Sequence, residues 1–154
     1  MSTECARRHR VLALLALVGL VGLLAGCRVN PVSGKKQLVL ISPERELALG
    51  DAEHPNVVNT YDGRYQDPEL NRYLEAIVDR LHRVSHRSEM PTEFTVLNTS
   101  VLNAFALPGH VYATRGFLVR LENEAQFAAV MAHELTHVAA GHSAQRMSNQ
   151  VLLS

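Results

Sequence analysis

Cysteine and tryptophan are scarce in this sequence. Its two cysteines, Cys5 and Cys27, both precede residue 28 of 154, so no disulfide can form within the rest of the chain. Tryptophan is absent, and 15 lysines and arginines are balanced by 15 aspartates and glutamates. The sequence therefore lacks the basic excess that favours nucleic-acid binding, and we expect no nucleic-acid partner.

The sequence also lacks an apolar run long enough to cross a membrane as a helix. The longest run, Val11 to Leu24, has 14 residues, whereas a membrane-spanning helix needs about 20. Arg7, Arg8 and Arg10 precede this run. A basic start followed by a short apolar run is typical of a secretory signal peptide.

The predicted signal ends in Leu24-Ala25-Gly26-Cys27, which resembles the bacterial lipobox. We therefore expect residues 1–26 to be removed and Cys27 to carry lipid that anchors the protein to a membrane. An uncleaved anchor helix, or an ordinary signal with a chance cysteine, is the alternative. Arg28 stands where an aspartate would resemble an inner-membrane retention signal. This favours the outer membrane of a bacterial envelope, facing the periplasm.

Proline after a capping residue marks two helix starts. Ser42-Pro43 and Asp67-Pro68 each place a side-chain acceptor before a proline that fits the first helical position. The first helix is predicted to end before Pro55. The second has apolar residues at three- and four-residue spacing and is predicted to run to about His86. Its basic end, which includes Arg87, is predicted to be solvated.

Strand signals lie between these helices and a third one. Residues 94–98 and 110–116 are predicted strands of a small sheet, and Asn123 caps a long helix with Gln126 as its capping-box partner. The pattern predicts a predominantly helical α+β fold with the sheet beside the third helix. We divide the chain into a signal peptide (1–26), a tether and docking segment (27–41) and one domain (42–154).

The third predicted helix contains an H-E-x-x-H pattern, formed by His133, Glu134 and His137. Histidines four residues apart lie on one face of a helix and can bind one Zn²⁺ ion, beside which Glu134 would lie. Zinc lowers the pKa of a bound water to about 7, and Glu134 can accept its proton. The pattern also arises by chance, but the surrounding apolar residues predict a packed helix. Burying such side chains there is costly without a metal.

A zinc site needs a third protein ligand, and His142 is the nearest histidine. On a continuous helix it faces away from His133 and His137. In the metzincin pattern a glycine and a histidine follow the second ligand by three and six residues. Here Gly141 and His142 follow His137 by four and five residues. We therefore interpret His142 as a structural or supporting residue instead of a ligand.

Three stretches of the chain resemble the HtpX-like and CaaX-prenyl-protease-like zinc metallopeptidases of peptidase family M48, above all its lipid-anchored bacterial members. These stretches are NPVSGKKQLVLIS, NAFALPGHVYATRG and NEAQFAAVMAHELTHVAAGHSAQR. The resemblance implies a zincin-like domain with His133 and His137 as zinc ligands and Glu134 as general base. It also implies an edge strand that binds substrate, formed by Asn103, Ala104, Phe105 and Ala106. A packed strand is the alternative for those four residues.

The resemblance implies further parts that this sequence does not show. In the family the third ligand is a glutamate on a later helix, and the transition-state stabiliser also lies downstream. No acidic residue lies between Glu134 and Ser154, and Pro108-Gly109-His110 stands where the family usually has two glycines after the proline. We expect this chain to be the N-terminal portion of the domain, with weak zinc binding and little turnover on its own.

By this resemblance the full-length protein is a zinc endopeptidase that hydrolyses misfolded or misassembled envelope proteins. Two other functions stay open. One is a non-catalytic lipoprotein, either a chaperone or an assembly factor, that binds unfolded outer-membrane proteins and carries a vestigial motif. The other is a different zinc hydrolase, such as a peptidoglycan amidase or peptidase. A Glu134→Gln variant tests the first alternative, and cleavage of muropeptides tests the second.

Overall fold

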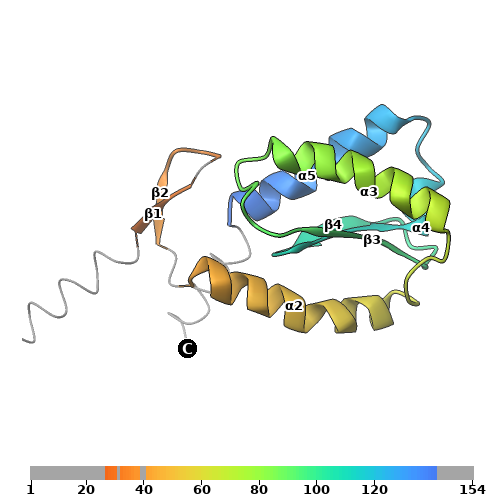
Figure 1. Ribbon diagram of the computed structural model, residues 1–154, viewed down its shortest axis with the longest axis horizontal. Helices are drawn as coiled ribbons and strands as arrows, with labels where there is room; N and C mark the ends of the chain where they lie inside the picture. The colour runs from red at the N-terminus through yellow and green to blue at the C-terminus, as the bar shows by residue number, and fades with distance from the viewer. Residues whose placement is uncertain (1–26, 31, 39–40, 142–154) are drawn as a thin grey trace, which may run out of the picture.

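The computed structural model describes residues 27–30, 32–38 and 41–141. Their main part has three layers, with a small sheet between helices on its two faces. The predicted signal peptide and His142 lie outside the described residues. The elements, in chain order, are β1 (Cys27–Val29), β2 (Lys36–Leu38), α2 (Pro43–Thr60), α3 (Pro68–Arg83), β3 (Glu93–Leu97), β4 (Ala104–Leu107), β5 (His110–Thr114), α4 (Arg115–Leu118) and α5 (Glu124–Ala139). Helices α3 and α5 lie on one side of the sheet and α2 on the other (Figure 1). No helix among the described residues is long and apolar enough to cross a membrane.

The central sheet has three strands, with β5 between β3 and β4. Strand β3 runs parallel to β5, and this register places Glu93 beside His110. Strand β4 pairs antiparallel with β5 through a tight turn at Pro108-Gly109. Gly109 has φ of 81° there, a conformation that favours glycine. Among the described residues only β5 pairs with β4, so β4 is an edge strand.

The hydrophobic core lies between the sheet and the pair of helices α3 and α5. Alternation along β5 turns Val111 and Ala113 into this core, whereas His110 and Tyr112 contact α2. The buried core residues are Leu74, Ile77, Val78, Phe94, Val96, Val111, Ala113, Phe117, Phe127, Met131 and Leu135. Both faces of β5 are therefore covered, and all five of its residues are buried.

The predicted end of the first helix is wrong, because α2 continues through Pro55 to Thr60. Proline removes one helical hydrogen bond, but residues on both sides of it contact the sheet. His54 bonds the Tyr112 hydroxyl at 2.8 Å, and the Tyr61 ring packs on Phe105 with centroids 5.3 Å apart. These contacts hold the helix in place past the proline. The second helix and strand are confirmed with small shifts, ending at Arg83 and Thr114.

The prediction that Arg87 belongs to a solvated basic end is also wrong. Its side chain is 9% exposed and donates from Nη1 to both carboxylate oxygens of Glu46, each at 3.0 Å. The same Nη1 lies 3.2 Å from the carbonyl oxygen of Val138 near the end of α5. Glu46 comes from α2, distant in sequence, so no local pattern could indicate this partner. The buried pair links α2 to the metal-binding helix predicted from the sequence.

Asn30 makes a second contact with the end of α5. Its side-chain oxygen accepts hydrogen bonds from the backbone N–H groups of Val32 and Ser33, at 2.9 and 3.0 Å. Its side-chain amide donates to the carbonyl oxygen of Ala140 at 3.0 Å, and Asn30 is buried. The turn between β1 and β2 is thereby attached to the C-terminal end of α5.

Gly50 lets α2 approach the hairpin of β4 and β5. A Cβ atom at this position would overlap the backbone carbonyl oxygen of Pro108, which cannot move aside as a flexible side chain can. We expect Gly50→Ala to lower the free energy of unfolding by about 1–3 kcal/mol, measured by urea denaturation. Ala48→Ser, at an exposed position of the same helix, is the matched control. Equal stability of both variants would contradict the close approach.

Candidate metal centre

Helix α5 positions the H-E-x-x-H side chains through its cap and its buried face. Asn123 caps the helix by accepting a hydrogen bond from the N–H of Gln126 at 3.0 Å, as predicted. The buried face consists of Phe127, Met131, Leu135 and Ala139. His133 and His137 each follow one of these residues by two positions, about 200° around the helix. Both histidines therefore lie on the face opposite the core.

The two imidazoles converge on one point. Their Nε2 atoms lie 2.9 Å apart, and the ring centroids are 4.5 Å apart with the rings nearly perpendicular. Two nitrogens bound to one tetrahedral zinc ion are about 3.3 Å apart. The pair therefore needs only a small adjustment to hold a metal ion. Glu134 lies next to His133 on the same helix and is half-buried.

The prediction that these two histidines are buried is wrong. His133 and His137 are both exposed, because apolar residues fill only the opposite face of α5. The cost of burying histidines therefore gives no support to a metal site here. The support comes instead from the convergence of the two Nε2 atoms. An exposed pair also suits a site that an extended chain must reach.

The described ranges contribute no third metal-binding side chain to this pair. Within residues 27–30, 32–38 and 41–141, one group of three histidine, cysteine, aspartate or glutamate side chains has its ligand atoms close together, and it lies elsewhere. His133 and His137 would thus supply two of the four positions of a tetrahedral zinc site.

Strand β4 lies beside α5 (Figure 1) and, among the described residues, is one of the two edge strands of the sheet. Asn103 precedes it and is bonded to Thr114, with the Asn103 N–H 3.1 Å from the Thr114 hydroxyl and the Thr114 N–H 3.0 Å from the Asn103 carbonyl. The Phe105 ring stacks on Tyr112 at 4.8 Å, on the α2 side of the sheet. Ala104 and Ala106 pack against the core side. The structure thus brings residues 103–106 next to the helix that carries His133 and His137.

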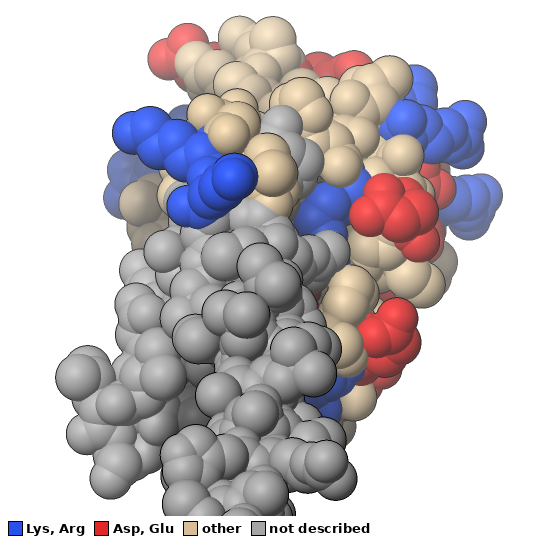
Figure 2. Space-filling view, turned by 90° about the vertical axis from the view of Figure 1, so that its left-hand side faces the viewer, with Lys and Arg blue, Asp and Glu red and all other residues tan. Residues whose placement is uncertain are grey.

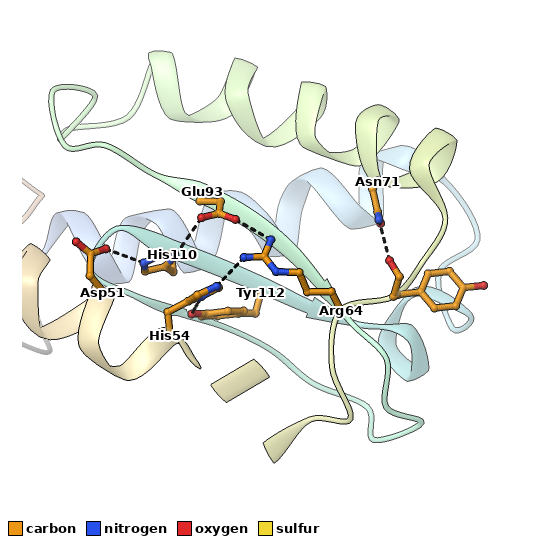
Figure 3. Close-up of polar contacts among 8 residues, drawn as sticks. Asp51, His54, Arg64, Asn71, Glu93, His110 and Tyr112 are labelled. Carbon is orange, nitrogen blue, oxygen red and sulfur yellow. Dashed lines mark hydrogen bonds and ion pairs between the residues drawn. The ribbon is translucent and has the colours of Figure 1, made fainter. Parts of the chain in front are cut away.

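A second polar cluster, which no sequence pattern predicted, lies between α2 and the other face of the sheet. It contains His54, Glu93 and His110, with Arg64 bonded to two of them (Figure 3). These residues come from separate elements, and only the parallel register of β3 and β5 brings Glu93 and His110 together. One feature of the sequence could have pointed to this cluster: His110 stands where the family usually has a glycine.

The surroundings of this cluster shift the pKa values of His54, Glu93 and the neighbouring Tyr112 in different directions. Burial, together with the nearby His110 and Arg64, lowers the pKa of His54 below its ordinary value. Burial acts to raise the pKa of Glu93, but its bond to Arg64 and the surrounding positive charge outweigh burial and lower it. Burial raises the pKa of the Tyr112 hydroxyl. At neutral pH the cluster therefore contains a neutral His54, an ionised Glu93 and a protonated Tyr112.

The face of the molecule seen in Figure 2 is neither mainly basic nor mainly acidic in its described part. Both basic and acidic side chains occur on the described part of that face, among uncharged ones.

Comparison with known proteins identifies the family. The sequence profile of "Peptidase family M48" matches residues 68–154, more than half of the chain. The "Beta-barrel assembly-enhancing protease" of Yersinia pestis is 30% identical over 134 residues, which cover 86% of this chain and 27% of that protein. The "Mitochondrial metalloendopeptidase OMA1" of Schizosaccharomyces pombe is 30% identical over 123 residues, covering 77% of this chain and 36% of that protein.

A third relative, the "Beta-barrel assembly-enhancing protease" of Escherichia coli, is 36% identical over 85 residues, covering 54% of this chain and 18% of that protein. The chain thus spans about a quarter of the length of the Yersinia pestis relative. The family profile includes the whole of α3, the sheet and α5, and the H-E-x-x-H residues lie within it. This chain therefore belongs to peptidase family M48.

Proposed function

We propose that the chain carries the metal-binding helix of a zinc endopeptidase that hydrolyses misfolded or misassembled proteins of the bacterial envelope. The observation that carries this proposal is the convergence of the His133 and His137 Nε2 atoms, 2.9 Å apart, on an exposed helix face beside an edge strand. The protein is held at the outer membrane by lipid on Cys27. The third zinc ligand comes from outside the described residues.

Glu134 acts as the general base in this proposal. When bound by His133 and His137, zinc supplies Lewis acidity that polarises the scissile carbonyl. Glu134 follows His133 directly, so its carboxylate lies beside the metal position and within reach of an attacking water. It accepts a proton from that water and delivers it to the nitrogen of the departing amine.

Residues 103–106 hold the substrate in an extended conformation. An edge strand presents backbone N–H and C=O groups that a second strand can pair with, and β4 has such an edge next to α5. Main-chain pairing does not depend on the side chains of the substrate. This mode of binding suits an enzyme that acts on unfolded segments of many proteins. Folded proteins offer few such segments.

The names of the relatives support an envelope substrate. The Yersinia pestis and Escherichia coli proteins are named for enhancing β-barrel assembly. β-Barrels of this sort belong to outer membranes, where the proposed lipid anchor would place this protein. An outer-membrane barrel protein that has failed to fold is therefore the substrate class we propose.

The test is cleavage by the purified full-length protein of one outer-membrane barrel protein, offered unfolded and folded. We expect fragments from the unfolded form only, loss of cleavage after zinc is removed with 1,10-phenanthroline, and recovery when zinc is restored. Casein serves as a second unfolded substrate. Cleavage of purified muropeptides without any cleavage of unfolded protein would instead assign the site to peptidoglycan.

A further inference from the structure

Three side chains of types that can bind a metal ion, from three elements, face one another between α2 and the sheet (Figure 3). His54 comes from α2, Glu93 begins β3 and His110 begins β5. One ligand atom of each lies within 4.8 Å of the others. The His54 ring stacks on His110 with centroids 4.3 Å apart, which brings α2 onto the two strands. This cluster is on the opposite side of the sheet from α5.

His110 is oriented as a metal ligand would be. Its Nε2 lies 2.9 Å from Asp51 Oδ1, and because a carboxylate only accepts, the hydrogen is on Nε2. In the neutral imidazole the lone pair is then on Nδ1. That atom is buried and has no hydrogen-bond partner among the described residues. A carboxylate that fixes the far nitrogen of a histidine is a common partner of metal-binding histidines.

The separation between His110 and Glu93 suits a shared ion better than a direct bond. His110 Nδ1 and Glu93 Oε2 are 3.9 Å apart, too far for a hydrogen bond. Two atoms that bind one zinc ion are about 3.3 Å apart in a tetrahedral site. A relative shift of about 0.6 Å would bring both atoms to that spacing.

His54 also directs a lone pair into this cluster. Its Nε2 lies 2.8 Å from Arg64 Nη2, and because a guanidinium only donates, Nε2 is the acceptor. Its Nδ1 then donates to the Tyr112 hydroxyl at 2.8 Å.

A cation already lies among these acceptors, in the form of the Arg64 guanidinium. Its Nη1 donates to Glu93 Oε1 at 2.8 Å while its Nη2 donates to His54. The side chains of Arg64 and Glu93 are each 46% exposed. Ion pairs this open to solvent are weak, so Arg64 can leave the cluster.

We propose that His54, Glu93 and His110 form a second divalent-metal site, for which the Arg64 guanidinium competes with the ion. Two imidazoles and one carboxylate are donors that suit zinc, with water in the fourth position. Binding requires the half-buried His54 ring to turn out of its stack with His110, so that its Nε2 faces the same ion. Such an ion would cross-link α2 to β3 and β5. The proposal does not depend on peptidase activity.

The test removes the first site and titrates the second. His133 and His137 are exposed, so the double variant His133→Ala/His137→Ala leaves the core intact. We expect this variant of the full chain to bind one zinc ion, measured by competition with a chromophoric chelator. Adding Glu93→Gln or His110→Phe should weaken binding at least about tenfold, and adding Arg64→Gln should strengthen it about tenfold.

Arg80→Gln is the matched control, because it removes another exposed arginine–carboxylate pair, with Glu124, far from the cluster. It should leave zinc affinity unchanged. As a second readout, histidine ring NMR signals of the unsubstituted chain should show zinc shifting His54 and His110 as well as His133 and His137. The proposal would be overturned if the double variant bound zinc with a dissociation constant no lower than about 100 µM. It would also be overturned if adding Arg64→Gln or His110→Phe left that affinity unchanged.

Discussion

Glu134→Gln in the full-length protein should lower kcat/KM for unfolded substrates about 10²–10⁴-fold. Glutamine keeps the shape of glutamate but cannot accept a proton from the attacking water. The proposed zinc ligands are His133 and His137, so replacing Glu134 should leave the amount of bound zinc unchanged. The loss should appear in kcat with KM nearly constant, since the substrate still pairs with β4. Steady-state cleavage of a fluorogenic unfolded protein, with metal content measured on the same sample, checks this.

Glu124→Gln is the control for this variant. Glu124 lies on the same helix, is about half exposed, and bonds Tyr73 and Arg80 away from the metal pair. It should keep activity within about twofold, as surface substitutions do. If Glu134→Gln retains cleavage at the level of this control, Glu134 is not the general base. If it loses cleavage but the cellular role persists, the role is a non-catalytic one in binding or assembly.

Arg87→Met should lower the free energy of unfolding by about 3–5 kcal/mol. The Glu46 side chain is 1% exposed, and both of its oxygens accept from Arg87 Nη1. Methionine fills similar volume but leaves that carboxylate buried without its cation. The carbonyl of Val138 loses a donor in the same step. Urea denaturation followed by circular dichroism measures the change.

Two further variants test whether the loss of stability comes from the buried ion pair itself. Glu46→Met combined with Arg87→Met should recover most of the loss, because a well-packed apolar pair can replace a buried ion pair. Arg80→Met breaks the exposed pair with Glu124 and should cost at most about 1 kcal/mol. An Arg87→Met variant as stable as Arg80→Met would show that the Glu46–Arg87 contact contributes little in solution.

The helix starts could be predicted because their signals are local. Ser42, Asp67 and Asn123 each accept a hydrogen bond from the N–H three residues later, as a capping side chain does. The His133–His137 pair was predictable for the same reason, since four residues of helix place both on one face. A short segment of sequence contains everything that these features need.

Features that join distant segments could not be predicted in this way. The continuation of α2 past Pro55 depends on contacts with β4 and β5, and Arg87 is buried only because α2 supplies Glu46. The exposure of His133 was missed because the H-E-x-x-H spacing fixes a helix face without saying what covers it. The cluster at His54 required the register between β3 and β5, for which the sequence has no marker.

If Cys27 carries lipid, the bond from Asn30 to Ala140 limits how far the proposed active site can move from the membrane. Asn30 is only three positions after Cys27, the proposed lipid carrier, which is about 10 Å of extended chain. Asn30 binds the carbonyl of Ala140, less than one helical turn after His137. A protein anchored through Cys27 would therefore work within a shallow zone at the bilayer surface. It would meet barrel proteins stalled at the membrane before those diffusing freely through the periplasm.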